Sequence, residues 1–185
     1  MRLVLVLITL NLIFPQKDQI SDEQNQAIKE ITKDIDKAPD FSLLSINDST
    51  YTLSELKGSV VLVNFWATWC GPCIMEIKDF NEIYKKYKDK GLEILGISIS
   101  DSKKQLENFT KSYKIDYPIL YGQGSEINKI IRDYGGVYAV PTSFVIDKEG
   151  KIIWQYPGAI LKDYDPQTYA NLIYAIEKSI KSSIK

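Results

Sequence analysis

Hydrophobic residues along this chain form an alternation of strand-like and helix-like segments from residue 41 onward. Residues 60–67 (VVLVNFWA) form a nearly continuous apolar run, which is typical of a strand buried on both faces. Residues 71–88 carry apolar side chains three or four positions apart, which predicts a helix with one buried face. Further strands are expected at 92–100 and 117–121, and further helices at 103–113 and 125–134. The alternation favours an α/β fold with a central mixed, mainly parallel sheet and helices on both faces.

Turn residues mark two hairpins that flank this alternation. The turn clusters are NDS at 47–49 and KEG at 148–150. The hairpin strands are expected at 41–46, 51–53, 142–147 and 151–156. Asp165 followed by Pro166 is an N-cap with a first-turn proline, so a last helix is expected to begin there.

The first 37 residues are expected to lie outside the folded domain. Arg2 precedes an apolar run at 3–14, which is shorter than the roughly 20 residues that a membrane-spanning helix needs. Residues 1–15 are therefore predicted to be a signal peptide or an uncleaved N-terminal anchor. Either one would place the domain in the periplasm or at the outer face of the cytoplasmic membrane. Residues 16–37 predict a polar, partly helical linker, and the domain is expected at 38–185.

Composition excludes several classes of function. The 23 basic and 24 acidic residues leave a net charge of −1, so no nucleic-acid-binding surface is indicated. The chain has no histidine, which excludes Ser-His and Cys-His nucleophile pairs and imidazole metal sites. Any cysteine chemistry must use Cys70 and Cys73, the two cysteines of the chain.

These two cysteines lie where a predicted strand passes into a predicted helix. Cys70 is therefore expected at a helix N-terminus, where free amides and the helix dipole stabilise a thiolate. Cys73 lies one turn further on and faces inward, which suits a resolving thiol. Pro72 fits the first turn of a helix because the amide that it lacks would be unpaired there. The pattern favours redox catalysis over a structural disulfide, a zinc site or a chance CxxC, since a loop this short gains little from closure and zinc needs about four ligands.

Three sequence motifs carry a resemblance to a known family. Residues 65–73 (FWATWCGPC) resemble the active site of the thioredoxin superfamily. Residues 38–41 (APDF) resemble the entry motif of the TlpA/ResA/CcmG-type exported thiol–disulfide oxidoreductases and of the related AhpC/TSA peroxiredoxins. Residues 136–147 resemble the cis-proline segment. The resemblance implies a thioredoxin-like fold with an N-terminal β-hairpin extension and a central helical insert.

The resemblance also implies roles for particular residues. Val140 and Pro141 would form a cis peptide bond that faces the cysteines, with the Val140 backbone pairing to an extended substrate. Trp69, Gly71 and Pro72 would contact the same substrate, whereas Trp66 is expected in the core.

A carboxylate beside the cysteines is a further implication of the resemblance. Thioredoxins carry a buried aspartate where this chain has Asn64, and the TlpA/ResA-like proteins instead have a glutamate that corresponds to Glu76. Glu76 would accept the proton of Cys73, and the alternative is an ordinary solvent-exposed helix glutamate.

The function expected from these observations is that of a thiol–disulfide oxidoreductase, and more narrowly a protein-disulfide reductase of the cell envelope. Its partners would be proteins with disulfides, apocytochrome c among them, and a membrane dithiol donor. No metal or cofactor is expected, and the domain is expected to be a monomer. The alternatives are a peroxiredoxin-like antioxidant, a copper-binding dithiol module and an oxidising disulfide donor. The peroxiredoxin alternative is weakened because Ala67 stands where the P-x-x-x-T-x-x-C pattern has threonine.

Overall fold

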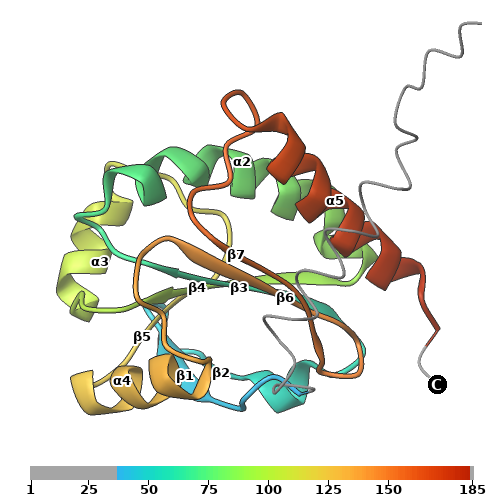
Figure 1. Cartoon of the computed structure of the whole chain (residues 1–185). Helices are drawn as coiled ribbons and strands as arrows, with labels where there is room; N and C mark the ends of the chain where they lie inside the picture. The colour runs from blue at the N-terminus through green and yellow to red at the C-terminus, as the bar shows by residue number, and fades with distance from the viewer. Residues whose placement is uncertain (1–36, 184–185) are drawn as a thin grey trace, which may run out of the picture.

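A seven-stranded sheet forms the centre of the computed structural model, which describes residues 37–183 (Figure 1). The strands are β1 (Ser42–Ser45), β2 (Thr50–Thr52), β3 (Val60–Trp66), β4 (Leu92–Ser98), β5 (Ile119–Tyr121), β6 (Thr142–Ile146) and β7 (Ile152–Pro157). The helices are α2 (Gly71–Tyr87), α3 (Lys103–Thr110), α4 (Gly124–Asp133) and α5 (Pro166–Lys181), with short 3-10 turns η1 (Leu53–Leu56) and η2 (Lys88–Lys90). Each strand and helix predicted within residues 37–183 is present, and α3 ends three residues earlier than predicted.

The strand order is β2-β1-β5-β4-β3-β6-β7, and the sheet is mixed, as predicted. Parallel pairing is limited to β5-β4 and β4-β3 in the centre, whereas the other four pairings are antiparallel. The expectation of a mainly parallel sheet therefore holds only for these three central strands. Two of the four antiparallel pairings, β1-β2 and β6-β7, are hairpins, which pair their strands antiparallel. The other two, β1-β5 and β3-β6, join these hairpins to the central strands.

Helices pack against both faces of β3 because its side chains alternate between the two faces. Val61, Val63 and Phe65 join a core cluster that includes Ile127 and Ile130 of α4. Val60 and Leu62 face the opposite side, where their cluster is completed by residues of α2 and α5, namely Phe80, Ile83, Leu172 and Ile176. Figure 1 shows α2 and α5 above the sheet and α4 below it. This burial on two faces explains the continuous apolar run of β3.

An insert of α3 and β5 separates β4 from α4, at the place where a central helical insert was expected. Strand β5 pairs with β4 on one side and with β1 on the other. The N-terminal hairpin therefore joins the sheet only through the strand of this insert.

The described chain begins beside the β6–β7 turn. The backbone N–H of Ala38 donates to the carbonyl of Gly150 at 2.8 Å, and that of Gly58 donates to the carbonyl of Lys148 at 3.0 Å. Both contacts lie at the end of the sheet where β3 starts, opposite the first turn of α2 (Figure 1).

The predicted signal or anchor at 1–15 and the predicted linker up to residue 36 lie outside the described residues. Within residues 37–183, no helix combines the length and the apolar character needed to cross a membrane.

Candidate active site

Strand β3 delivers the chain to a disulfide at the start of α2. Cys70 is the N-cap of α2, with extended backbone at φ −85° and ψ 103°, and Pro72 occupies the first turn. Cys70 and Cys73 are joined by a disulfide, and the backbone N–H of Cys73 donates to Cys70 Sγ at 3.2 Å. One amide of the first helical turn therefore donates to the sulfur of Cys70, which agrees with the helix N-terminal position expected from the sequence.

The segment before β6 lies against this disulfide. The Val140–Pro141 peptide bond is cis, as the resemblance implied. Cys70 Sγ lies 3.6 Å from the carbonyl oxygen of Val140. The loop from α4 reaches this bond through Gly135 and Gly136, whose φ values of 80° and 86° suit residues without a side chain.

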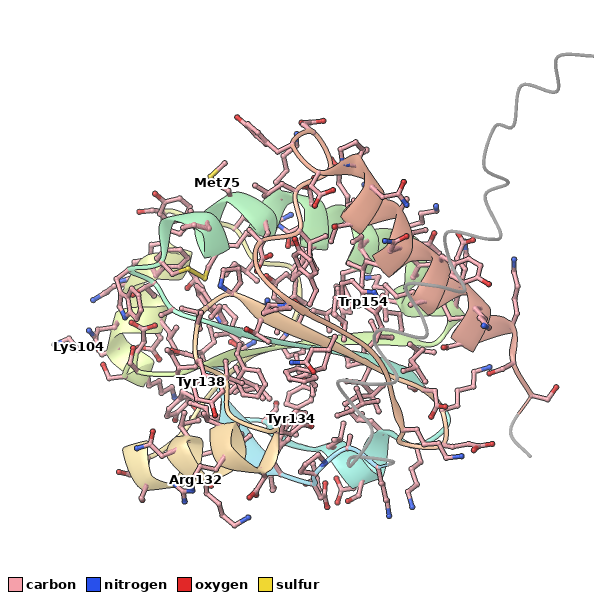
Figure 2. The ribbon with its side chains drawn as sticks, in the orientation of Figure 1. Met75, Lys104, Arg132, Tyr134, Tyr138 and Trp154 are labelled. Atoms are coloured by element: carbon pink, nitrogen blue, oxygen red, sulfur yellow. A yellow bond between two sulfur atoms is a disulfide. The ribbon has the colours of Figure 1, made fainter. Side chains whose placement is uncertain are left out.

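Large apolar side chains are exposed around the disulfide. Trp69 is 66% exposed, and its indole Nε1 donates to Ser100 Oγ at 3.0 Å, which fixes the ring in place. Met75 and Tyr138 are also exposed, and Figure 2 shows them on opposite sides of the disulfide in that view. By contrast, Trp66 is buried and packs against Phe109 of α3, as expected of a core residue. The exposed side chains could contact a bound polypeptide.

Glu76 lies in the interior, only 1% exposed, so it is not a solvent-exposed helix glutamate. Its Oε1 accepts a hydrogen bond from Asn64 Nδ2 at 2.9 Å, and its Oε2 accepts one from the backbone N–H of Ile160 at 3.1 Å. Burial raises the pKa of Glu76 to about 8, although both hydrogen bonds favour the charged form. A carboxyl with a pKa near neutrality, one helical turn from Cys73, can accept and release a proton.

Asp79 holds the loop that carries Ile160. This carboxylate, one turn beyond Glu76 on α2, accepts the backbone N–H of Lys162 at 2.9 Å. Two successive turns of α2 therefore bind two backbone amides of the segment between β7 and α5. The nearby charge of Asp79 also contributes to the raised pKa of Glu76.

A buried carboxylate, Asp101, ties the loop before Cys70 to the end of β4. It accepts the backbone N–H of Thr68 at 2.9 Å, the Thr68 hydroxyl at 2.6 Å and the Ser98 hydroxyl at 2.8 Å. Sequence reasoning missed both Asp101 and Asp79. The one available signal was that each acidic residue stands beside predicted buried positions.

Replacing Asp101 by alanine is expected to lower the free energy of unfolding by about 3 kcal/mol, because three donors lose their acceptor in a buried site. Urea denaturation of the oxidised protein would measure this loss. The exposed Asp163 provides a control, since its change to alanine should leave the unfolding free energy within about 0.5 kcal/mol of the original. Equal stability of the two variants would contradict the assigned role of Asp101.

No group of three or more acidic or cysteine side chains within residues 37–183 is placed to hold a metal ion.

Comparisons with known proteins agree with this geometry. The family model described as the AhpC/TSA family matches residues 35–155. The thiol-disulfide oxidoreductase ResA of Bacillus thuringiensis subsp. konkukian (strain 97-27) is 39% identical over 141 residues, which are 76% of this chain and 79% of that protein.

Two solved structures are also similar. One is a putative thiol:disulfide interchange protein DsbE from Chlorobium tepidum, with a TM-score of 0.67 and 31% identity over 77% of this chain and 96% of that chain. The other is the exposed lipoprotein thioredoxin Etrx1 from Streptococcus pneumoniae strain TIGR4, with a TM-score of 0.59 and 34% identity over 71% of this chain and 98% of that chain.

Proposed function

The chain belongs to the AhpC/TSA family and is one of its thioredoxin-fold thiol–disulfide oxidoreductases, and we propose that it reduces disulfides of exported proteins through Cys70 and Cys73. One observation carries the proposal most directly. The disulfide joins the helix N-cap residue Cys70, which is 5% exposed, to Cys73, which is 1% exposed and lies one turn further on, beside a cis-proline segment. This arrangement supplies one nucleophile that a substrate can reach and one thiol that can displace the product.

The first step is attack by Cys70. Its thiolate, stabilised by the amides at the start of α2, attacks one sulfur of the substrate disulfide. A bond forms between Cys70 and that sulfur, the substrate S–S bond breaks, and the other substrate sulfur leaves as a thiolate that takes a proton from water.

The second step is resolution by Cys73. Its thiol proton passes to the carboxylate of Glu76, and the resulting thiolate attacks Cys70 Sγ. The Cys70–Cys73 bond forms, and the second substrate sulfur leaves as a thiolate. Two electrons have then passed from the protein to the substrate. A dithiol donor must return them before the next turnover.

Substrate binding is assigned to the exposed surface around Cys70. The Val140 backbone, next to the cis bond and 3.6 Å from Cys70 Sγ through its carbonyl oxygen, would pair with an extended segment. Trp69 offers an exposed ring beside the nucleophile, and Gly71 and Pro72 expose their backbone at the start of α2, where a Cβ on Gly71 would meet nothing within 4 Å. Because backbone pairing at Val140 needs an extended partner, we assign this surface to an extended substrate segment rather than to a folded one.

The site of action is proposed to be the cell envelope. The apolar run at residues 3–14 supports export or anchoring, and one of the similar structures is that of an exposed lipoprotein. The electron donor would then be a membrane dithiol protein, and apocytochrome c is one candidate substrate.

Changing Cys73 to serine is expected to trap the substrate on Cys70, because the second step needs the sulfur of Cys73. Expressing the tagged variant and identifying mixed disulfides by non-reducing gels and mass spectrometry would test the function. The Cys70→Ser variant is the matched control and should trap far less substrate through Cys73, which is 1% exposed against 5% for Cys70 and is not the helix N-cap residue. Equal trapping by the two variants, or trapping by neither, would contradict the proposed roles.

A further inference from the structure

Asn64 connects the buried carboxyl of Glu76 to the strand that follows the cis-proline. Its amide nitrogen donates to Glu76 Oε1 at 2.9 Å and to Ser143 Oγ at 3.1 Å. Asn64 is 2% exposed and Ser143 is fully buried. The three side chains come from β3, α2 and β6, so this short chain of hydrogen bonds crosses the interior behind the disulfide.

The carboxylate and the acid form of Glu76 need different neighbours. The carboxylate accepts hydrogen bonds, and Asn64 and the Ile160 amide supply two donors. The acid form carries an O–H that needs an acceptor, which a backbone N–H cannot provide. A buried O–H without an acceptor costs about 1–3 kcal/mol, so Glu76 needs a partner that can accept.

Asn64 can provide that acceptor without moving its backbone. Rotation of its amide about the last side-chain torsion places the carbonyl oxygen where the nitrogen now lies. That oxygen accepts from protonated Glu76, and the Ser143 hydroxyl, which both donates and accepts, turns to donate to the rotated amide. An aspartate at this position could not donate in its charged form, and an apolar residue could do neither.

We propose that Asn64 is a positioning residue for the proton transfer, because its amide, held by Ser143, changes from donor to acceptor as Glu76 takes the proton of Cys73. The inference rests on the proposed role of Glu76 in the second step. It adds that the step depends on two neutral residues, Asn64 and Ser143, which act through Glu76.

Other ionisable groups around Glu76 do not replace this function. Asp79 on α2 binds the Lys162 amide and adds only negative charge. Burial, followed by the charge of Glu76, raises the pKa of Tyr117, so its phenol stays neutral. Cys73 is the proton source itself. Asn64, by contrast, is hydrogen-bonded to Glu76 and has a side chain that can both donate and accept a hydrogen bond.

The test follows the second step of the reduced full-length protein from pH 5 to pH 10. A peptide disulfide that carries a fluorophore and a quencher is the probe, and stopped-flow fluorescence with acid trapping separates mixed-disulfide formation from release. The variants are Asn64→Ala, Ser143→Ala, Glu76→Gln and the exchange Asn64→Asp/Glu76→Gln. Asn81→Ala is the control, because Asn81 also bridges backbone groups of Lys114 and Asp116 but does not contact Glu76.

The hydrogen bond from Asn64 lowers the pKa of Glu76, so its removal should move the release profile to higher pH. Asn64→Ala should slow release about tenfold at pH 7, and Ser143→Ala about threefold, with unchanged mixed-disulfide formation. The exchange variant keeps one carboxylate and one amide in contact, and should release the product about tenfold faster than Glu76→Gln alone. Asn81→Ala should keep the original profile.

Two outcomes would overturn the inference. If Glu76→Gln alters the profile but neither Ser143→Ala nor the exchange variant behaves as stated, Asn64 has no positioning role and the role of Glu76 stands. If Glu76→Gln also leaves the profile unchanged, the role of Glu76 fails as well. Ser143→Ala and the exchange variant keep the test decisive even if Asn64→Ala does not fold.

Discussion

A reduction potential of about −270 mV, close to that of thioredoxin, is expected for the Cys70–Cys73 pair. A dithiol becomes a strong oxidant when its thiolate is over-stabilised, because the reduced form is then favoured. Here only Gly71 and Pro72 separate the cysteines, and the chain has no histidine. Residues 65–75 contain no charged side chain, so the amides of α2 are the main source of stabilisation. Glu76, one turn from Cys73, is an acid and adds no positive charge that would stabilise a thiolate.

Equilibration with dithiothreitol or glutathione buffers, followed by thiol quantification, would measure this potential. The gap to the strongly oxidising value of about −120 mV corresponds to roughly five orders of magnitude in the equilibrium constant, since about 30 mV is tenfold. A Pro72→His variant is the control, because a cation between the cysteines should raise the potential. A value above roughly −170 mV for the unmodified protein would identify an oxidant and contradict the proposed reductase.

A second large effect is expected on stability, where Glu76→Gln should stabilise the oxidised protein at alkaline pH. The pKa of Glu76 is raised from 4.5 to about 8 in the folded protein. Between these values the unfolded chain releases a proton that the folded protein keeps, so rising pH favours unfolding. Stability is therefore highest below pH 4.5, falls up to about pH 8 and is constant above it as far as this group is concerned. The accumulated loss over the whole range is about 5 kcal/mol, of which about 4 kcal/mol falls between pH 5 and pH 9.

Urea denaturation of both proteins at pH 5 and pH 9 would test this expectation. The stability difference between Glu76→Gln and the original protein should grow by about 4 kcal/mol in favour of the variant from pH 5 to pH 9. Glu82→Gln is the matched control on the same helix, because Glu82 is exposed and forms its ion pair with Lys162 at the surface. A difference that does not change with pH would show that Glu76 is not the buried titrating group.

Local patterns predicted most of the fold. The continuous apolar run of β3, the turn clusters of both hairpins and the Asp165–Pro166 helix start are each determined by neighbouring residues, and each was predicted correctly. The direction of pairing was harder to predict. Whether β1 pairs with β5 depends on contacts between segments about 75 residues apart, and no local pattern reports such a contact.

The site was predictable only as far as its motifs extend. Cys70, Cys73 and the cis bond at Pro141 lie in recognisable segments. Local motifs did not predict the surroundings of Glu76, because the backbone N–H that donates to its carboxylate belongs to Ile160, which is 84 positions away. Asn64 looked like the loss of a proton acceptor, and only its contacts show that it is bonded to Glu76 instead.

The contact between Ala38 and Gly150 fixes the place where the chain enters the domain. Strand β3 runs from that end of the sheet toward Cys70, and its seven residues span about 23 Å. Any attachment through the residues before Lys37 would thus meet the domain at the end of β3 opposite to the disulfide. In a tethered molecule, the sulfur of Cys70 would lie on the side of the domain away from the attachment point. Rotation of the domain about that point would move the sulfur over a large distance. One molecule could then reach both a donor embedded in the membrane and a newly exported chain beyond it.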